Sequence, residues 1–240
     1  MKPVRICLWS GPRNISTALM YSFGQRSDTT IVDEPLYAHY LCSTSAKEYH
    51  PGSKEVLLFQ ENNGEKAVKN MMSDVFETPV VFFKHMTHHL INLDKSFLKE
   101  TENIILTRDP KEMITSFIKQ IPNPVITDTG YPQHLELLNY LAEIGKSPLI
   151  VDSKDLLLNP KKKLTELCSY LNIPFQDAML KWEAGPRKED GVWAKYWYHN
   201  VHKSKDFQLY QAKNEPIPES LMSLYQECDR IYKQLISDNK

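Results

Sequence analysis

The stretch that decides the fold is VRICLWSGPRNISTALMYSF, residues 4–23. Residues 4–9 are rich in apolar side chains and predict a buried strand, and residues 16–24 predict a helix that Ser16 or an immediate neighbour caps. The loop at residues 10–17 therefore joins a strand to the N-terminus of a helix. Such a terminus presents unpaired backbone N–H groups and the positive end of the helix dipole, so this loop is suited to bind an anion.

The side chains of this loop also suit phosphate or sulfate oxygens. Gly11 lets the backbone approach a ligand closely, and Ser16 and Thr17 carry hydroxyl donors. Arg13 adds a permanent charge with a planar fork that matches such oxygens. A plain strand–helix turn with a serine cap and a surface arginine is the alternative interpretation. The loop is not a Walker A motif, because GxxxxGK[ST] requires a second glycine and a lysine where this chain has Ile15 and Ser16.

The composition of the chain limits the classes of partner that it is expected to bind. The chain has 240 residues, with 29 Lys and Arg against 30 Asp and Glu, and its formal net charge is −1. This length fits one α/β domain, so we expect residues 1–240 to form a single domain without nucleic acid as a partner. The four cysteines form no CxxC pair, which favours a reduced, cytoplasmic setting. No apolar run approaches the ~18 residues of a membrane span, so no membrane association is expected.

Apolar strands alternate with helices along the rest of the chain. Strands are predicted at residues 29–35, 79–86, 103–110 and 147–152, and helices at 36–41, within 54–76, and at 111–120, 132–145, 160–171 and 218–237. This alternation predicts a three-layer α/β fold, in which helices flank a central parallel sheet. Residues 183–215 lose the periodicity, and their aromatic residues favour a long functional loop before the final helix. Ligands of such sheets bind beyond the carboxyl ends of the strands.

A second anion site is predicted after the strand at residues 103–110. Arg108 lies at the end of this strand, and Ser116 follows eight residues later, about two turns into a helix that begins near Pro110. We expect Arg108 to reach an anion beside the first loop, with Ser116 contributing a hydroxyl. A local ion pair with Asp109, or a capping role, is the alternative interpretation.

With both sites in view, the chain resembles a sulfotransferase that uses 3′-phosphoadenosine 5′-phosphosulfate (PAPS). SGPRNISTAL resembles the 5′-phosphosulfate loop of this family, and RDPKEMITS resembles its 3′-phosphate motif. VDSKDLLLNPKKKLTELCSYLNIP resembles the family's Asp-Leu, Asn/Asp-Pro and Leu-rich helical stretch. GPRKEDGVW resembles its late Arg-Lys-Gly loop with a nearby tryptophan. The four segments follow the family's order between residues 4 and about 195.

The resemblance implies a P-loop-like fold and sulfuryl transfer from PAPS, as donor substrate, to a hydroxyl or amine of a small molecule. It also implies which residues bind the donor. For the 5′ end these are Gly11, Pro12, Arg13, Asn14, Ser16 and Thr17, and for the 3′-phosphate they are Arg108, Ser116, Arg187 and Lys188.

The chain departs from the family's pattern at three places. Many members carry lysine at the position of Arg13, where arginine can offset charge on the bridging oxygen but does not readily donate a proton. Ser153 stands where cytosolic members have an aromatic residue. The run from Arg187 to Gly191 replaces a tighter Arg-Lys-Gly. Similar loops also occur joined to aminotransferase domains in plants, yet no lysine context here indicates a pyridoxal phosphate site.

Two segments supply candidates for the base that takes the acceptor's proton. Glu34 follows the second strand in VDEP, as the catalytic glutamate does in the heparan-type and bacterial relatives that the chain resembles. A carboxylate stabilised by a helix dipole is the alternative. KHMTHHL, residues 84–90, is the rival, since cytosolic relatives place Lys-Thr-His there with histidine as the base. Lys84 matches this pattern, Met86 takes the histidine's place, and the histidines nearby are His85, His88 and His89.

The adjacent histidines do not predict a metal site, because they lack helical i,i+4 spacing and no carboxylate or cysteine completes the set. The aromatic residues after Glu34 and in the late loop either line an acceptor pocket or fill the core. Two other functions stay open, a P-loop-like kinase or hydrolase and a non-catalytic nucleotide-binding domain. The sequence carries no signature of the acceptor and favours neither a monomer nor a homodimer.

Overall fold

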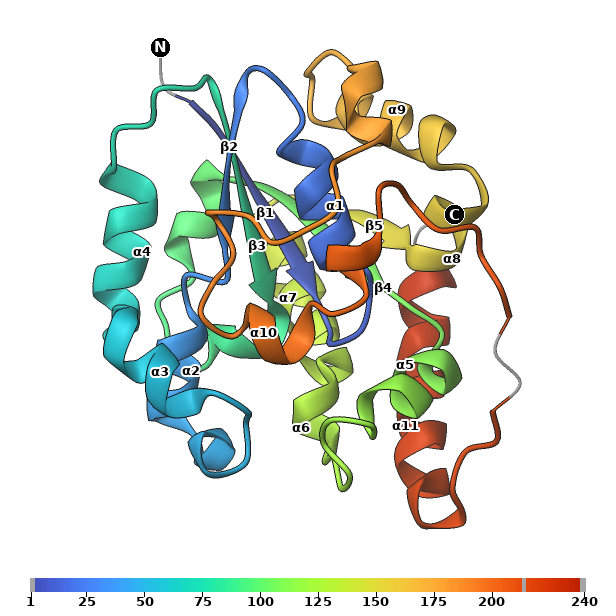
Figure 1. Ribbon diagram of the computed structural model, residues 1–240. Helices are drawn as coiled ribbons and strands as arrows, with labels where there is room; N and C mark the ends of the chain where they lie inside the picture. Colours follow the sequence, from blue (N-terminus) through green and yellow to red (C-terminus); the bar gives the residue numbers. More distant parts are fainter. Residues whose placement is uncertain (1–2, 213–214, 238–240) are drawn as a thin grey trace.

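The computed structural model describes residues 3–212 and 215–237, in which five parallel strands form one sheet between two layers of helices (Figure 1). β1 (Val4–Ser10) lies at the centre of the sheet and pairs with β3 (Val80–Met86) and β4 (Glu102–Thr107). β2 (Thr29–Asp33) and β5 (Leu149–Asp152) form the two edges, so the order is β2-β3-β1-β4-β5. The predicted α/β fold with a central parallel sheet is confirmed.

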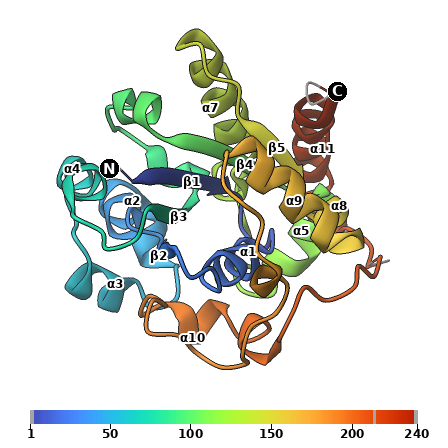
Figure 2. The same ribbon diagram turned by 90° about the horizontal axis from the view of Figure 1, so that it is seen from above.

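The central strand is apolar on both faces because helices cover both sides of the sheet. Ile6 and Leu8 pack toward α1 (Ser16–Phe23) and α9 (Pro160–Tyr170), while Trp9 packs on the opposite face. That face is covered by α4 (Gly64–Ser73) and α7 (Tyr131–Glu143). Figure 2 shows α1 and α7 on opposite sides of the sheet.

The remaining helices connect these layers. They are α2 (Tyr37–Ser43), α3 (Ser53–Phe59), α5 (Pro110–Phe117), α6 (Ile126–Thr129), α8 (Ser153–Leu158), α10 (Ala194–Trp197) and α11 (Met222–Ser237). The sequence did not predict α6 and α8, because helices this short show too little periodicity. The final helix, α11, packs on α5 through Cys228 and Ile231. None of the helices in the described ranges is long and apolar enough to cross a membrane.

The segment at residues 183–212, called the late loop below, crosses the carboxyl ends of the strands. Its one-turn helix α10 lies at the level of the carboxyl ends of the strands in Figure 1, and Figure 2 shows it outside α1 and β2. Lys195 of α10 forms an ion pair with Glu55 at 2.8 Å, and Asp190 accepts hydrogen bonds from Tyr21 at 2.8 Å and pairs with His202 at 2.9 Å. These contacts hold the late loop against α1 and α3. Two residues of the predicted loop, 213–214, lie outside the described ranges.

Candidate functional site

The loop after β1 has a backbone conformation suited to an anion. Arg13 and Ile15 have φ angles of 59° and 60°, in the left-handed region that non-glycine residues rarely adopt. Left-handed residues in such loops let neighbouring N–H groups converge on one point, as in anion-binding nests. Of the predicted caps, Ser16 or an immediate neighbour, the neighbour Ile15 occupies the N-cap of α1, and it makes no side-chain hydrogen bond there. Without a side-chain cap, the first N–H groups of α1 have no side-chain partner competing with a ligand.

Arg13 and Arg108 meet where this loop approaches the end of β4. Nη1 of Arg108 donates to the carbonyl oxygen of Arg13 at 2.8 Å, and Nε of Arg13 donates to Oγ of Ser116 at 3.0 Å. Burial, with Arg108 nearby, lowers the pKa of Arg13. Because the two guanidinium groups repel each other, an anion between them would stabilise both charges. The structure thus brings three of the predicted donor-binding residues together.

Arg108 also has an acidic partner that the sequence did not reveal. Its Nε and Nη2 donate to Oε2 of Glu112 at 3.0 and 2.8 Å, while Tyr210 of the late loop donates to Oε1 at 2.6 Å. Asp109 caps α5 by accepting from the N–H of Lys111 at 2.8 Å. Of the two alternatives weighed for this segment, Asp109 therefore has the capping role, and the ion pair of Arg108 is made with Glu112.

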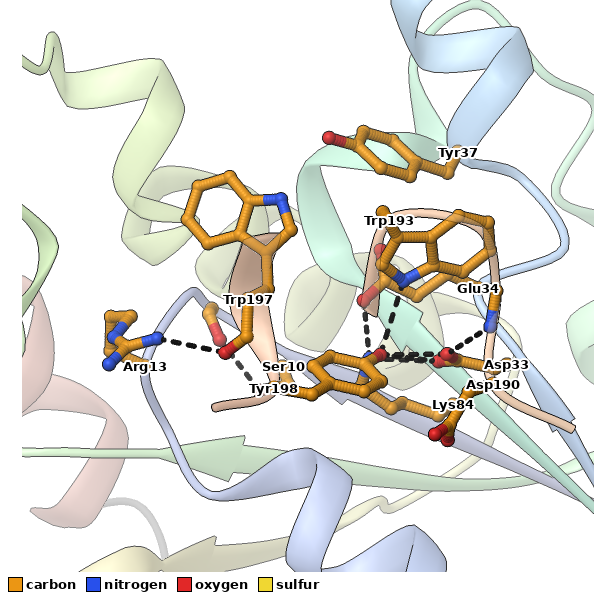
Figure 3. Close-up of polar contacts among 12 residues, drawn as sticks. Ser10, Arg13, Asp33, Glu34, Tyr37, Lys84, Asp190, Trp193, Trp197 and Tyr198 are labelled. Atoms are coloured by element: carbon orange, nitrogen blue, oxygen red, sulfur yellow. Dashed lines mark hydrogen bonds and ion pairs between the residues drawn. The ribbon is translucent and has the colours of Figure 1, made fainter. Parts of the chain in front are cut away.

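On the other side of β1, the ends of β2 and β3 bring three charged side chains into a buried cluster (Figure 3). Lys84 donates from Nζ to Oδ1 of Asp33 at 2.9 Å and to Oε1 of Glu34. The side chains of Lys84 and Asp33 are only 1% exposed and that of Glu34 is 8% exposed. Charges buried this deeply persist only when they are paired. The cluster therefore holds one cation between two carboxylates.

The backbone at Glu34 is strained and firmly held. Its φ is 41°, in the left-handed region, which turns the chain sharply from β2 toward α2. The N–H of Glu34 donates to the carbonyl of Lys84 at 2.8 Å, and its own carbonyl accepts from Nε2 of Gln60 at 2.8 Å and the N–H of Tyr37 at 3.0 Å. Strained residues of this kind concentrate at functional sites, where the surrounding structure fixes them.

The environment makes Glu34 a stronger base than an ordinary carboxylate. Burial raises the pKa of Glu34, and the neighbouring Asp33 raises it further, while Lys84 opposes both effects. Burial works to lower the pKa of Lys84, but the two carboxylates outweigh it and raise that pKa, so the ammonium stays charged. A base whose pKa is shifted toward neutrality accepts a proton more effectively near pH 7.

A tyrosine of the late loop completes the cluster. The hydroxyl of Tyr198 accepts from Nζ of Lys84 at 2.7 Å and from Nε1 of Trp193 at 3.2 Å. It donates to the carboxylate of Asp33, whose oxygens lie 2.9 and 2.7 Å away (Figure 3). The N–H of Gly191 also donates to Asp33 at 3.3 Å. Asp33 and Tyr198 are 165 residues apart in the sequence, so only the fold unites them.

One cavity of about 370 Å³ joins the two sides of β1. Charged and polar residues of both sides line it, namely Arg13, Ser16, Thr17, Glu34, Lys84, Arg108 and Ser116. Its aromatic walls come from Tyr37, Phe117, Trp193, Trp197 and Tyr198. The residues described include no group of three or more His, Cys, Asp or Glu arranged to hold a metal ion.

Comparison with known proteins identifies the family of this chain. A family profile described as a sulfotransferase domain matches residues 4–232. The chain belongs to the sulfotransferase domain family. The predicted resemblance is therefore confirmed at the level of the family.

Two solved structures share the fold of this sulfotransferase domain. The sulfotransferase domain of the Synechococcus PCC 7002 olefin synthase has a TM-score of 0.61 and 18% identity, over 97% of this chain and 95% of that chain. The sulfotransferase of Alicyclobacillus acidocaldarius has a TM-score of 0.59 and 10% identity, over 99% of this chain and 96% of that chain. At these identities the likeness shows the fold alone.

Two curated proteins of Arabidopsis thaliana are more similar in sequence to this sulfotransferase domain. They are named branched-chain-amino-acid aminotransferase-like proteins 2 and 1, and each is 38% identical, over 95% and 100% of this chain. The matches cover 40% and 43% of those proteins, so this chain spans about two fifths of their length. Their names describe those longer proteins.

The histidines predicted as rival bases of the sulfotransferase domain lie in different environments. His85 stacks on Trp9 at 4.2 Å, on the opposite face of β3 from Lys84, because neighbouring strand residues point to opposite faces. His85 does not line the cavity, so it is not placed to act as the base. His88 and His89 do line it. Burial lowers the pKa of His88 to about 3 and that of His89 well below its ordinary value, so both are weak bases.

Another histidine of the cavity was missed by the sequence analysis. Nδ1 of His50 lies 2.9 Å from the hydroxyl of Tyr37, and burial lowers the pKa of His50 to about 4. His50 follows a short 3-10 turn in a segment without clear periodicity, so nothing in the sequence marked it. Like His88 and His89, it is therefore a neutral imidazole at pH 7.

Arg187 and Lys188 are not brought to the cavity of the sulfotransferase domain. The guanidinium of Arg187 lies 4.5 Å from the ring centre of Tyr21 and donates from Nη2 to the carbonyl of Glu183 at 2.9 Å. The side chain of Lys188 is 90% exposed. Both line a separate hollow beside Thr30 of β2. The structure thus separates this pair from Arg108 and Ser116, although the resemblance had grouped all four at the 3′-phosphate.

The other predicted loop residues shape the turn. A Cβ at Gly11 would lie 2.7 Å from the carbonyl oxygen of Thr129, so this position requires glycine for close packing. The side chain of Asn14 donates from Nδ2 to the carbonyl of Leu106 at 3.0 Å, which ties the loop to β4. Pro12 and Asn14 line the cavity beside Arg13.

Proposed function

We propose that this sulfotransferase domain transfers a sulfuryl group from PAPS to a hydroxyl or amine of a small-molecule acceptor. One observation carries the proposal. The loop after β1 and the Glu34–Lys84 pair open into the same cavity. In-line transfer requires a binding site for the donor anion on one side of the sulfuryl group and a base on the other side. The two ends of the cavity offer these two functions.

The proposed donor site uses the loop and the two arginines. Backbone N–H groups at the start of α1, with Ser16, Thr17 and Arg13, would bind the 5′-phosphosulfate end. Arg108 and Ser116 would bind the 3′-phosphate. Since Glu112 already pairs with Arg108, the 3′-phosphate competes with this carboxylate for the guanidinium.

In the proposed reaction Glu34 accepts the proton of the acceptor's hydroxyl or amine. The acceptor oxygen or nitrogen then forms a bond to sulfur while the bond from sulfur to the bridging oxygen of the 5′-phosphate breaks. Negative charge develops on that oxygen, and 3′,5′-ADP leaves. Lys84 and Arg13 supply positive charge on the two sides of the moving group, which is the main catalytic contribution in transfers of this kind. Glu34 then releases its proton to solvent.

The acceptor end of the proposed site is aromatic and uncharged apart from the Glu34–Lys84 pair. Nε2 of His50, Nδ1 of His88 and both ring nitrogens of His89 are buried without a hydrogen-bond partner among the described residues. Buried polar atoms generally find a partner. We therefore expect the acceptor to hydrogen-bond one or more of these neutral imidazoles.

Binding of the reaction product tests the proposal directly. Isothermal titration calorimetry with 3′,5′-ADP should show tight, magnesium-independent binding, since the residues proposed for its phosphates are cationic or carry N–H and O–H donors. Absence of binding by folded protein would refute the proposed donor. Magnesium-dependent binding of ATP in its place would favour a kinase or hydrolase. Transfer of labelled sulfate from PAPS to a panel of hydroxyl and amine compounds then identifies the acceptor.

A further inference from the structure

The hydroxyl of Tyr198 uses its full hydrogen-bonding capacity within the buried cluster. A phenol has one donor and two acceptor positions. Here the oxygen accepts from Lys84 and from Trp193, and the proton goes to Asp33. Tyr198 is 4% exposed, so water does not replace these partners without a rearrangement of the late loop. A fully satisfied buried network of this kind fixes the positions of its members.

The two carboxylates of the cluster have different positions. Glu34 lines the cavity, whereas Asp33 is not part of the cavity wall. Asp33 accepts from Lys84, from Tyr198 and from the N–H of Gly191, so its charge is neutralised by the protein itself. Asp33 is therefore suited to be the permanent counter-ion of Lys84, while Glu34 faces a ligand.

Tyr198 lies on the late loop, whose other contacts surround the same cavity. Nη1 of Arg13 donates to the carbonyl of Trp197 at 3.4 Å, and Lys195 pairs with Glu55. The late loop thus contacts the donor end through Arg13 and the acceptor end through Tyr198. Because Tyr198 accepts a hydrogen bond from Lys84, a shift of the late loop would directly change the hydrogen bonding of Lys84.

We propose that Tyr198 is a positioning residue whose hydroxyl fixes the Lys84 ammonium between Asp33 and Glu34, so that docking of the late loop sets the geometry in which Glu34 works. This inference rests on the proposed function, because it takes Glu34 as the base. Without the Tyr198 hydroxyl, Asp33 has one hydrogen-bond donor fewer, so the Lys84 ammonium moves toward Asp33. The ion pair between Lys84 and Glu34 then weakens, and the pKa of Glu34 rises.

A substitution at Asp33 has the opposite effect. Without the Asp33 charge, Lys84 pairs with Glu34 alone and the repulsion between the two carboxylates disappears, so the pKa of Glu34 falls. The titratable groups whose charges act on Glu34 or Lys84 from the surrounding elements are Asp33, Tyr37, His89 and Tyr198, with His85 acting from the opposite face of β3. Burial lowers the pKa of His85 to about 3 and that of His89 well below its ordinary value, and it raises the pKa of both tyrosines, so none of the four titrates in the range where the raised pKa of Glu34 is expected.

The test titrates the Glu34 carboxyl carbon by 13C NMR, with its resonance assigned through its loss in Glu34→Gln. Tyr198→Phe should raise the Glu34 pKa, Asp33→Asn should lower it, and Tyr196→Phe should leave it unchanged. Tyr196 is a matched control, because it lies on α10 and its hydroxyl is 3.5 Å from Glu55 at the surface. In sulfation assays, Tyr198→Phe should lower kcat about 10-fold or more with little change in KM for PAPS.

The Glu34 pKa measured in these variants decides whether Tyr198 has the proposed positioning role. Opposite shifts in Tyr198→Phe and Asp33→Asn support it, whereas an unchanged Glu34 pKa in Tyr198→Phe overturns it, even if kcat falls. If Tyr198→Phe does not fold, Asp33→Asn alone decides by the presence or absence of a lowered pKa. Because this titration needs no sulfation, failure of the proposed function appears separately, as absent 3′,5′-ADP binding.

Discussion

The two ends of the cavity hold their charges in different ways. At the donor end, Arg13 and Arg108 lie close together, and neither guanidinium is fully buried. At the acceptor end, Lys84 is buried between two carboxylates and closed in by Tyr198. The donor end has excess positive charge for an anion that must enter and leave, while the acceptor end keeps one cation between two carboxylates in a cluster that stays in place. The difference suggests that ligand binding and proton transfer can be disrupted separately.

Removal of the Glu34 charge should give the largest effect, confined to catalysis. Glu34→Gln keeps the shape of the side chain but removes the base, so we expect sulfation to fall about 10²- to 10⁴-fold. The affinity for 3′,5′-ADP, measured by calorimetry, should stay within about 2-fold, because Glu34 lies at the other end of the cavity from the arginines. Glu143→Gln, on the exposed side of α7, is the matched control. Full activity in Glu34→Gln would place the base elsewhere, with His88 and His89 next.

Truncation of an arginine at the donor end should weaken nucleotide binding, which the Glu34 substitution leaves unchanged. Arg108→Ala removes a charged hydrogen-bond donor, so we expect a loss of about 2 to 3 kcal/mol in 3′,5′-ADP binding, roughly 30- to 150-fold in Kd. Lys119→Ala removes an exposed cation just beyond the same helix and should leave Kd unchanged. Equal affinity of Arg108→Ala and the parent protein would remove Arg108 from the proposed donor site.

The pH dependence of sulfation should reveal the buried carboxylate. Glu34 acts as a base only when ionised, so kcat/KM should fall about 10-fold for each pH unit below its pKa. Because burial raises this pKa, the midpoint should lie above the ordinary glutamate value. A pH–rate profile between pH 4 and 9 measures this midpoint. An acid limb at or below the ordinary value would contradict the assigned environment of Glu34.

The smallest effect is expected at Lys188. Its side chain is 90% exposed and lies outside the cavity, so Lys188→Ala should change the Kd for 3′,5′-ADP by no more than about 2-fold. The same calorimetric assay serves for this variant and for Arg108→Ala. A loss comparable to that of Arg108→Ala would show that the late loop moves Lys188 to the nucleotide, as the resemblance had implied.

The sequence predicted residues at both ends of the cavity, but it misplaced Arg187 and Lys188 at the donor end and His85 at the acceptor end. Arg13 and Arg108 lie in local strand–loop–helix patterns, whose positions follow from periodicity and strand order. The alternation of side chains along β3 also implies that His85 points away from Lys84 and therefore away from the cavity. The late-loop aromatics that include Tyr198 were expected either to line a pocket or to fill the core, but the contacts of Tyr198 with Lys84 and of Gln60 with Glu34 could not be found this way, since they join segments far apart in the sequence.

The left-handed backbone at Glu34 has a consequence for protein engineering. A non-glycine residue in this conformation costs the folded state about 1 to 2 kcal/mol, which glycine would largely recover. The backbone strain alone would therefore favour loss of the very side chain on which activity is proposed to depend, and the buried pairing with Lys84 opposes that loss. A stabilised variant of this domain should be sought at positions away from the β2–α2 junction.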